Sequence, residues 1–209
     1  MAPTARAENT RQRVLDAALS VYRKHGHDGF NIHAIVAESG VSLGSIYHHF
    51  GSMDGLAAAL YARSMGELLG RVAAALNSTR SVRRGVARIV DAYLQFARTQ
   101  RTQMAFIHAS AYASFLPAHA TQIAQSKARI HEVRAFFAEH AAAGRIAPMP
   151  EWLLEIMVIG PAAELTRRWL SDSTINLDEA RPILAERIFR AIHIPKHKRG
   201  SPAVKPSQT

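Results

Sequence analysis

The chain lacks cysteine altogether, and it also lacks any long hydrophobic run. The absence of cysteine excludes disulfide bonds, thiol catalysis and cysteine-ligated zinc. No apolar stretch approaches the ~18–20 residues that cross a bilayer, and the N-terminus has no apolar segment typical of a signal peptide. With 209 residues, 48% of them hydrophobic, the chain can still bury a substantial core. We therefore expect a cytoplasmic protein with no membrane partner.

Two nucleotide-binding motifs of common enzymes are missing as well. The sequence contains no Walker loop and no G-x-G-x-x-G. The segment His131-Glu132-Val133-Arg134-Ala135 begins like the H-E-x-x-H of zinc proteases, but Ala135 stands at the second ligand position. Five of the eleven histidines lie in the first 51 residues, and their spacing fits no regular ligand pattern. We therefore expect no enzymatic activity, no metal and no cofactor.

Strand patterns are absent too, since nearly every segment has the helical period. The sequence predicts an all-α chain with helices at 10–25, 32–38, 43–50, 53–76, 81–100, 102–115, 118–143, 150–170 and 178–192. Residues 1–9 are predicted to form a disordered arm. The polar, proline-containing residues 195–209 are predicted to form a disordered basic tail.

The most informative segment is residues 31–50, NIHAIVAESGVSLGSIYHHF. Asn31 and Ser42 are suitable helix caps, because their side chains can accept hydrogen bonds from the first turn of a helix. Gly40 between them tolerates the left-handed backbone that a helix exit commonly needs. Two short helices joined by such a turn form a helix-turn-helix unit, whose second helix fits the DNA major groove.

These residues, with their surroundings, resemble the tetracycline-repressor (TetR) family of bacterial transcriptional regulators. The resemblance is carried by Gly40-Val41-Ser42, Gly44-Ser45-Ile46-Tyr47, His49-Phe50, Gly51-Ser52 and Leu56, and upstream by the helix at 10–25 with Gly26, Gly29 and Phe30. Two positions depart from the family pattern. Met53 stands where a lysine close to a phosphate is usual, and Val36 stands where a small alanine is usual.

The resemblance implies an N-terminal three-helix DNA-binding domain, residues 10–52, followed by a six-helix regulatory domain, residues 53–194. The second domain is expected to bind a small-molecule effector and to form a homodimer. Because one reading helix covers few base pairs, the expected DNA partner is a double-stranded, palindromic operator read by two protomers. Release of the operator by the effector would make the protein a repressor. The sign of regulation depends on promoter position, which the sequence does not specify.

Charge supports a nucleic-acid partner but does not single out the reading unit. The net charge is +10, which favours binding to phosphates. Residues 1–51 contribute five basic and four acidic side chains, residues 52–103 contribute eight and three, and residues 196–209 contribute four basic ones. The surplus therefore lies outside the helix-turn-helix, which leaves a non-specific architectural DNA-binding protein as the alternative. An arginine-rich, merely solvated surface explains most of the same surplus.

Sequence readout is expected from short polar and apolar groups. Leu43 and Ser45 can face base edges, and Gly44 permits close approach of the backbone. Tyr47 and His48 resemble the family's phosphate-contacting pair. The full predicted DNA-contacting set is Thr10, Arg11, Asn31, His33, Ser42, Leu43, Gly44, Ser45, Tyr47 and His48.

Some members of this set have a structural alternative. Ser42 is suited to cap a helix whether or not it touches DNA. Tyr47 can pack against its neighbours, and Arg11 can be a solvated side chain.

Dimerisation is expected on the last two helices, whose apolar stripes exceed what one small bundle must bury. The predicted interface is Leu153, Ile156, Met157, Gly160, Ile183, Leu184, Ile188 and Ile192. An ordinary core within one chain is the alternative for about half of these positions.

The middle helices carry the residues from which an effector pocket would be built. The predicted pocket residues are Tyr93, Phe96, Met104, His108, Tyr112, Phe136 and Glu164. Large apolar side chains line ligand cavities, although they more often fill a core. His108 and Glu164 are the polar groups expected to orient a ligand.

Overall fold

The computed structural model describes residues 5–77, 79–109 and 129–195, which form nine α-helices. Within these ranges the only strand-like pairing is an isolated bridge between Ile146 and His193, so the prediction of an all-α fold is confirmed. The helices are α1 (Ala5–His25), α2 (Ile32–Ser39), α3 (Leu43–Phe50), α4 (Met53–Leu76), α5 (Val82–Thr99), α6 (Arg101–His108), α9 (Ile130–Ala142), α10 (Glu151–Ser171) and α11 (Leu177–Ile192). None of these helices is long and apolar enough to cross a membrane.

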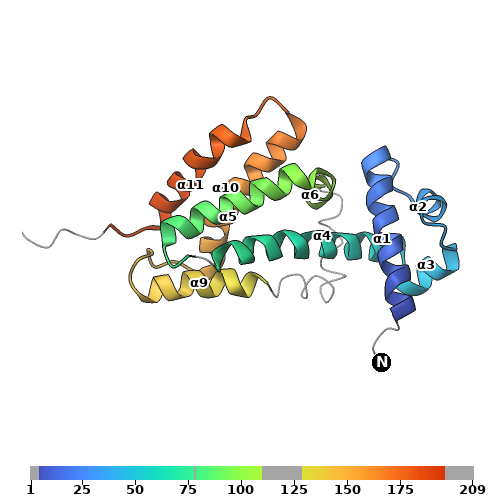
Figure 1. Cartoon of the computed structure of the whole chain (residues 1–209), viewed down its shortest axis with the longest axis horizontal. Coiled ribbons are helices and arrows are strands. Elements are labelled where there is room, and N and C mark those ends of the chain that lie inside the picture. Colours follow the sequence, from blue (N-terminus) through green and yellow to red (C-terminus); the bar gives the residue numbers. More distant parts are fainter. Residues whose placement is uncertain (1–4, 78, 110–128, 196–209) are drawn as a thin grey trace, which may run out of the picture.

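The first three helices pack into a small unit at one end of the molecule, which we call the head (Figure 1). Its core joins one face of α1 to the buried faces of α2, α3 and the first turns of α4. The fully or nearly buried members are Val14, Leu15, Ala18, Val21, Phe30, Ile35, Val41, Ile46, Phe50, Leu56, Ala57, Ala59, Leu60 and Phe106. This core extends into α4 as far as Leu60, beyond residue 52, at which the predicted DNA-binding domain ends.

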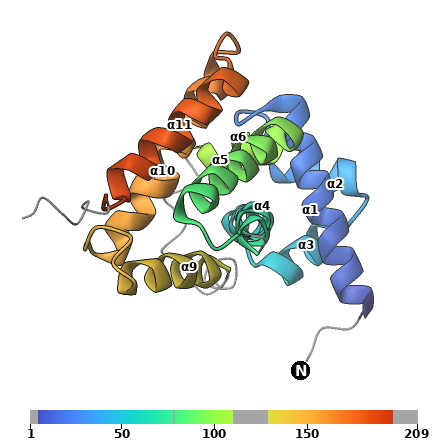
Figure 2. The ribbon, with the colours of Figure 1, turned by 60° about the vertical axis from the view of Figure 1, so that its left-hand side comes forward.

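Helix α4 connects the head to the rest of the chain, which we call the regulatory end. Figure 2 views α4 almost along its axis, with α5 on one side, α9 on another and the head around its far part. Leu56 and Leu60 belong to the head core, whereas Leu68 and Val72 belong to a second core. One uninterrupted helix therefore contributes side chains to both cores and connects them directly.

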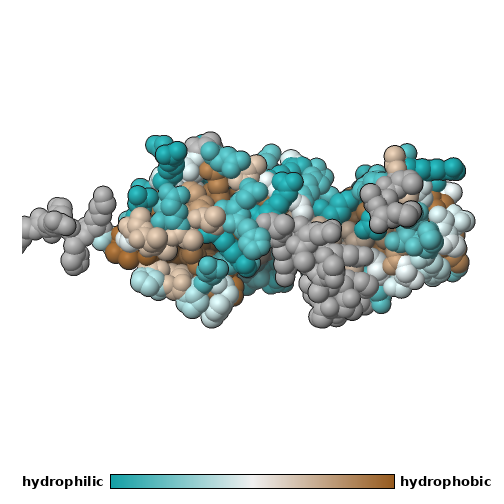
Figure 3. Space-filling view, turned by 90° about the horizontal axis from the view of Figure 1, so that it is seen from below, coloured by the Kyte–Doolittle hydropathy of each residue, from teal (hydrophilic) through white to brown (hydrophobic). Residues whose placement is uncertain are grey.

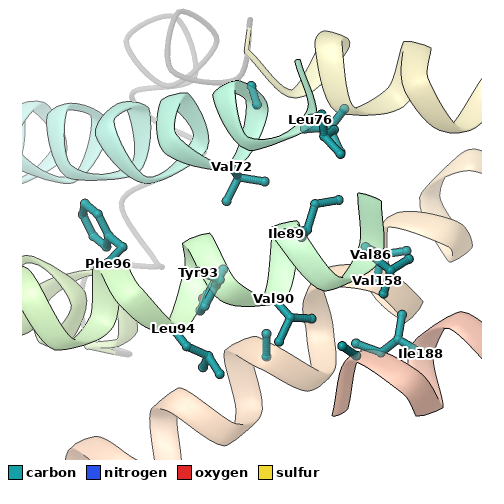
Figure 4. Close-up of a cluster of buried hydrophobic side chains, with 14 of the residues drawn as sticks. Val72, Leu76, Val86, Ile89, Val90, Tyr93, Leu94, Phe96, Val158 and Ile188 are labelled. Carbon is teal, nitrogen blue, oxygen red and sulfur yellow. The ribbon is translucent and has the colours of Figure 1, made fainter. Parts of the chain in front are cut away.

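The second core lies between α4, α5, α9, α10 and α11. Figure 4 shows Val72 and Leu76 of α4 facing α5, while Val90 on the opposite side of α5 faces α10 and α11. Helix α5 supplies more of this core than any other helix, because apolar residues recur along almost its whole length, among them Val86, Ile89 and Phe96, all fully buried. One broad face of α5 contacts several helices and fixes their relative positions, while Arg84, Asp91 and Gln95 on its other face are exposed.

The helix bounds correct two sequence expectations and leave part of a third untested. Residues 5–9 were expected in a disordered arm but begin α1, where Gln12 Nε2 donates to Glu8 Oε1 at 2.7 Å. Helix α6 ends at His108, because Ala109 has an extended backbone, and the rest of the expected helix 102–115 lies outside the described residues. Likewise, α9 begins at Ile130, and residues 118–128 of the expected helix 118–143 are not described.

Candidate DNA-binding surface

The turn between α2 and α3 is fixed by local hydrogen bonds. Asn31 Oδ1 accepts from Ala34 N at 3.0 Å and so caps α2. Gly40 ends that helix with φ +63°, a left-handed conformation that residues with a Cβ rarely adopt, and its N–H donates to Val36 O. Ser42 Oγ then accepts from Ser45 N at 3.3 Å and caps α3. The angle between the two helices is therefore specified within a few residues.

Helix α3 has two faces of opposite character. Ile46 and Phe50, one turn apart, are 0% and 6% exposed and anchor the helix in the head core. Leu43 and Tyr47 are 39% and 40% exposed, and a Cβ added at Gly44 would meet no atom within 4 Å. The outer face of α3 thus presents apolar, hydroxyl and bare-backbone surface, with no formal charge.

Residues 40–44 also spell G-x-S-x-G, a pattern that the sequence expectations overlooked. In hydrolases this pattern places a serine nucleophile between a strand and a helix. Here Ser42 lies between two helices, and its hydroxyl is occupied as a helix cap. The structure therefore gives no support to a nucleophile at this position.

The other predicted contact residues occupy varied positions. His33 and His48 are exposed on α2 and α3. Asn31 is exposed, but its side chain both caps α2 and donates from Nδ2 to Gly29 O at 3.2 Å. Thr10 Oγ1 donates to Arg6 O within α1, and the Arg11 guanidinium lies 4.9 Å from the centre of the Phe50 ring. Arg11 thus packs against the C-terminal end of α3 rather than extending freely into solvent.

A charged cluster holds α2 against α1. Glu38 of α2 accepts hydrogen bonds from Lys24 Nζ at 2.7 Å and Ser20 Oγ at 2.7 Å, both on α1. The bond from Lys24, followed by that from Ser20, lowers the pKa of the Glu38 carboxyl. The carboxylate therefore stays ionised and keeps the three side chains together at neutral pH.

Two links between the head and the regulatory end were not predicted from the sequence. Arg63 of α4 donates to Asp16 Oδ1 at 2.6 Å and to Leu15 O at 3.2 Å, so it binds α4 to α1. Phe106 of α6 is fully buried in the head core, with ring centroids 5.0 Å from Tyr22 and 5.5 Å from Phe30. A phenylalanine in a helical apolar pattern gives no signal about which of two cores it enters.

The expected dimer helices carry an apolar stripe that the chain itself does not cover. Trp152, Ile156 and Gly160 follow at intervals of four residues along α10, and the first two are 62% and 57% exposed. On α11, Ile183 is 57% exposed. Leu153, Met157 and Leu184 are half-buried. In the space-filling view of Figure 3, hydrophobic residues gather at the regulatory end of the molecule.

Two of the predicted interface residues are not available to a partner. Ile188 and Ile192 are 4% and 0% exposed and belong to the chain's own second core. They lie one turn and two turns from Leu184, on the side of α11 that faces α5. Apolar periodicity along α11 does not separate an inner from an outer face, so the sequence assigned both to one interface.

The predicted pocket residues mostly fill the core. Tyr93, Phe96 and Met104 are 4%, 0% and 0% exposed. His108 Nε2 lies 3.3 Å from the Tyr93 hydroxyl oxygen. Burial, followed by the nearby charge of Arg167, lowers the pKa of His108.

The remaining predicted pocket residues do not meet at one site. Phe136 is half-buried and sits against Gly85, where an added Cβ would lie 2.6 Å from its ring. Glu164 is bound on the surface by Arg167 and Arg168, whose hydrogen bonds lower its pKa to about 2. Tyr112 lies outside the described residues.

An apolar cavity does exist, at a place that the sequence did not indicate. It has a volume of about 220 Å³ and lies between α4, α9 and α10. None of the six predicted pocket residues that the structure describes lines it. Its walls come from Leu69 and Val72 of α4, Phe137 of α9, and Leu154 and Val158 of α10, among others. Within the described parts of the chain, no three histidine, aspartate or glutamate side chains gather closely enough to hold a metal ion.

Sequence comparison places the likeness to known proteins in the head. Residues 14–60 match the family described as "Bacterial regulatory proteins, tetR family". The chain is 36% identical over 52 residues to the HTH-type transcriptional repressor AcnR of Corynebacterium glutamicum, and 42% identical over 60 residues to the HTH-type transcriptional regulator SrpR of Pseudomonas putida. These matches cover 25% and 28% of this chain and 28% of each relative.

Solved structures extend the likeness in fold to most of the chain. A putative tetR family transcription regulator from Shewanella sp. PV-4 superposes with a TM-score of 0.74 at 20% identity, over 88% of this chain and 98% of that one. FadR from Bacillus subtilis, crystallised in complex with stearoyl-CoA, superposes with a TM-score of 0.72 at 18% identity, over 87% and 99%. At such identities the likeness concerns the fold. Residues 14–60 of this chain therefore form a helix-turn-helix block of the kind found in the tetR family of bacterial regulatory proteins, and the family match is confined to that block.

Proposed function

We propose that this protein is a sequence-specific DNA-binding transcriptional regulator that represses its target from an inverted-repeat operator and is released by a small-molecule effector. The observation that carries the proposal is the outer face of α3, which is exposed while Ile46 and Phe50 hold the helix rigidly from beneath. A helix presented in this way can enter the major groove as a fixed body. The naming of AcnR as a transcriptional repressor supports the same function.

Readout by this helix depends on shape and hydrogen bonding rather than on charge. Leu43 can contact thymine methyl groups, and the Ser45 and Tyr47 hydroxyls can donate to acceptors on bases or phosphates. Without a lysine or arginine on α3, non-specific attraction to the DNA backbone is modest at the point of contact. This arrangement favours a sequence-specific regulator over an architectural binder.

Two protomers are needed for a useful operator length. We propose that the stripe of Trp152, Ile156 and Gly160 on α10, with Ile183 on α11, pairs with the same stripe of a second copy. Such a two-fold arrangement would present two α3 helices to successive major-groove faces, ~34–36 Å apart on the DNA. The exposed area of these large apolar side chains supports the pairing, because isolated monomers rarely leave a contiguous apolar stripe in water.

Effector release would act through α4, which contributes to both cores. A ligand that binds better to a state with a different α4 position shifts the population away from the DNA-binding spacing. The complex of FadR with stearoyl-CoA supports a small-molecule effector in a chain of this fold, without specifying which molecule this protein binds.

The test is selection of bound duplexes from a random DNA pool at near-physiological salt. We expect enrichment of an inverted repeat. Uniform affinity for all duplexes with a steep salt dependence would instead identify an architectural binder. Two variants refine the result: Leu43→Ala should change the recovered sequence, whereas Tyr47→Phe should weaken binding to all sequences, because a phosphate contact carries no base information.

The dimer is tested separately by sedimentation of Ile156→Glu and Ile183→Glu. Both should shift the protein towards the monomer, and operator affinity should fall with them. Ile194→Glu is the matched control, since Ile194 is 37% exposed but lies beyond the end of α11. A dimer that survives both substitutions would place the interface elsewhere.

A further inference from the structure

We propose that the cavity between α4, α9 and α10 is the effector site, and that it takes an uncharged, mainly hydrophobic molecule with one oxygen acceptor, about the size of a substituted two-ring aromatic. This assignment rests on the proposed function, because it names the effector class of a ligand-released regulator. It also moves the effector away from Tyr93, Phe96 and Met104, which the structure uses to fill the core.

The walls of the cavity set the apolar character and the size of its ligand. Leu69, Val72, Val133, Phe137, Leu154 and Val158 form most of the lining. At about 220 Å³ the cavity is larger than the ~150 Å³ apolar cavity that stays dry and admits benzene. Side chains of this kind offer water few hydrogen bonds, so a hydrophobic molecule can replace the water in the cavity at little cost. One aromatic ring underfills the space, and a two-ring body fills it better.

The charges at the edge of the cavity argue against an ionic ligand. Arg134 Nη2 and Glu155 Oε2 lie 2.9 Å apart in an ion pair, and both residues line the cavity. Glu151 lines it too. One arginine and two glutamates give this edge a net charge of −1, so a carboxylate ligand would meet repulsion. A cation would have to compete with Arg134 for Glu155.

One donor at the same edge calls for an oxygen acceptor. The Nε–H of Arg134 is shielded from solvent and has no hydrogen-bond partner among the described residues. A buried donor in that state is unfavourable, because it has lost its hydrogen bonds to water without gaining a partner. A carbonyl or ether oxygen on an otherwise apolar ligand can satisfy it without breaking the ion pair to Glu155. The cavity therefore requires one hydrogen-bond acceptor on its ligand.

Occupation of the cavity bears directly on α4. Leu69 and Val72 form part of its wall, and three to four turns earlier in the same helix Leu56 and Leu60 are buried in the head core. A ligand that separates α4 from α9 and α10 therefore acts on the helix that connects to the head.

The experiment uses three probes with one ring system and the full-length protein. Methyl 2-naphthoate offers an uncharged carbonyl, naphthalene offers no acceptor, and 2-naphthoate offers an anion. By calorimetric titration, the ester should bind about tenfold more tightly than naphthalene, as expected for a hydrogen bond from a charged donor. The anion should bind more weakly than the ester. If 2-naphthoate binds most tightly, or if the ester does not bind, the proposed ligand class is wrong.

Three variants test whether the ester binds in the cavity. Ala138 lines the cavity from the exposed side of α9, so Ala138→Trp should fill it and abolish binding of the ester. Ala135→Trp is the matched control, because Ala135 is exposed on the same helix and does not line the cavity. Arg134→Lys keeps the positive charge opposite Glu155 but removes the Nε–H. The affinity of this variant for the ester should therefore fall to its affinity for naphthalene. Unchanged binding in Ala138→Trp would place the ligand elsewhere.

A final measurement separates this inference from the proposed function. Operator affinity, measured with the duplex selected from the random pool, should fall when methyl 2-naphthoate is added. If an operator is recovered but the ester leaves the affinity for it unchanged, the assignment of the cavity as the effector site is wrong. The proposal of a sequence-specific regulator is then unaffected. If the ester binds with the expected variant pattern but no duplex is enriched, the proposed function fails and the effector role fails with it.

Discussion

The head and the regulatory end specify their geometry by different means. In the head, α2, α3 and α4 each begin with a side chain that caps the first turn: Asn31, Ser42 and Ser52. At the regulatory end, α6, α9 and α10 have no side-chain cap, although α5 and α11 do. In the head, side-chain caps thus add to the packing of the core in fixing where α2, α3 and α4 begin, whereas α6, α9 and α10 depend on packing without such caps.

This difference agrees with where the relatives match. Identity of 36–42% is confined to 52–60 residues of sequence, and the family match covers residues 14–60. Beyond the head the fold is retained in structures at 16–22% identity. Packed apolar surfaces accept many side-chain combinations of similar volume, while a cap or a left-handed glycine accepts few. A region positioned by packing can also be reshaped around different ligands.

The largest expected effect comes from the residue that crosses between the two regions. Phe106→Ala removes a fully buried ring from the head core and should lower the free energy of unfolding by about 3–5 kcal/mol. Urea denaturation measures this loss. Tyr47→Ala is the contrasting variant, because Tyr47 is 40% exposed: stability should change little while operator affinity falls. Equal destabilisation by both would contradict the division of roles within the head.

The next effect tests how strictly the head backbone is fixed. Gly40→Ala should cost about 1–2 kcal/mol, because φ is +63° and a Cβ strains that conformation even though the space around it is open. Gly44→Ala, in α3 and with equally open space, should instead stabilise the helix slightly while blocking close approach to DNA. Thermal unfolding measures the stability of both variants, and titration with the operator measures their affinity for DNA.

A pair of caps applies the same chemistry to the two regions. Ser42→Ala in the head and Ser81→Ala at the start of α5 each remove one helix cap, with an expected loss of about 1 kcal/mol. Only Ser42→Ala should weaken operator binding measurably, because only that cap sets the position of α3. A loss of DNA affinity of the same size in Ser81→Ala would show that the regulatory end governs the head even without ligand.

The smallest effect is a pH dependence within the head. The pKa of Glu38 is lowered in the folded protein, chiefly by Lys24, relative to about 4.3 in an unfolded chain. Ionised Glu38 therefore stabilises the fold above that value, and the contribution is lost as pH falls through the lowered pKa. Glu38→Gln should be less stable than the parent at pH 7 and approach it at acidic pH. Lys24→Met should remove most of the same pH dependence. Chemical denaturation at a series of pH values checks both variants.

The sequence by itself determined the head. Its decisive features act within a few residues of the chain: the caps Asn31 and Ser42, the helix end at Gly40, and the buried pair Ile46 and Phe50. Such short-range features can be recognised from the sequence alone. The all-α character followed from helical periodicity for the same reason. What the pattern cannot express is which surface each apolar side chain finally meets.

Only the tertiary structure decided those pairings. Phe106 enters the head core while Met104, two residues earlier, enters the other core. Ile188 and Ile192 face inward while Ile183 faces out. The cavity lies beside Val72 rather than beside Tyr93, because its position depends on how α9 and α10 approach α4. Burial is non-directional and rewards any apolar partner, so a helix with apolar residues on several faces does not identify its neighbours until all the helices are in place.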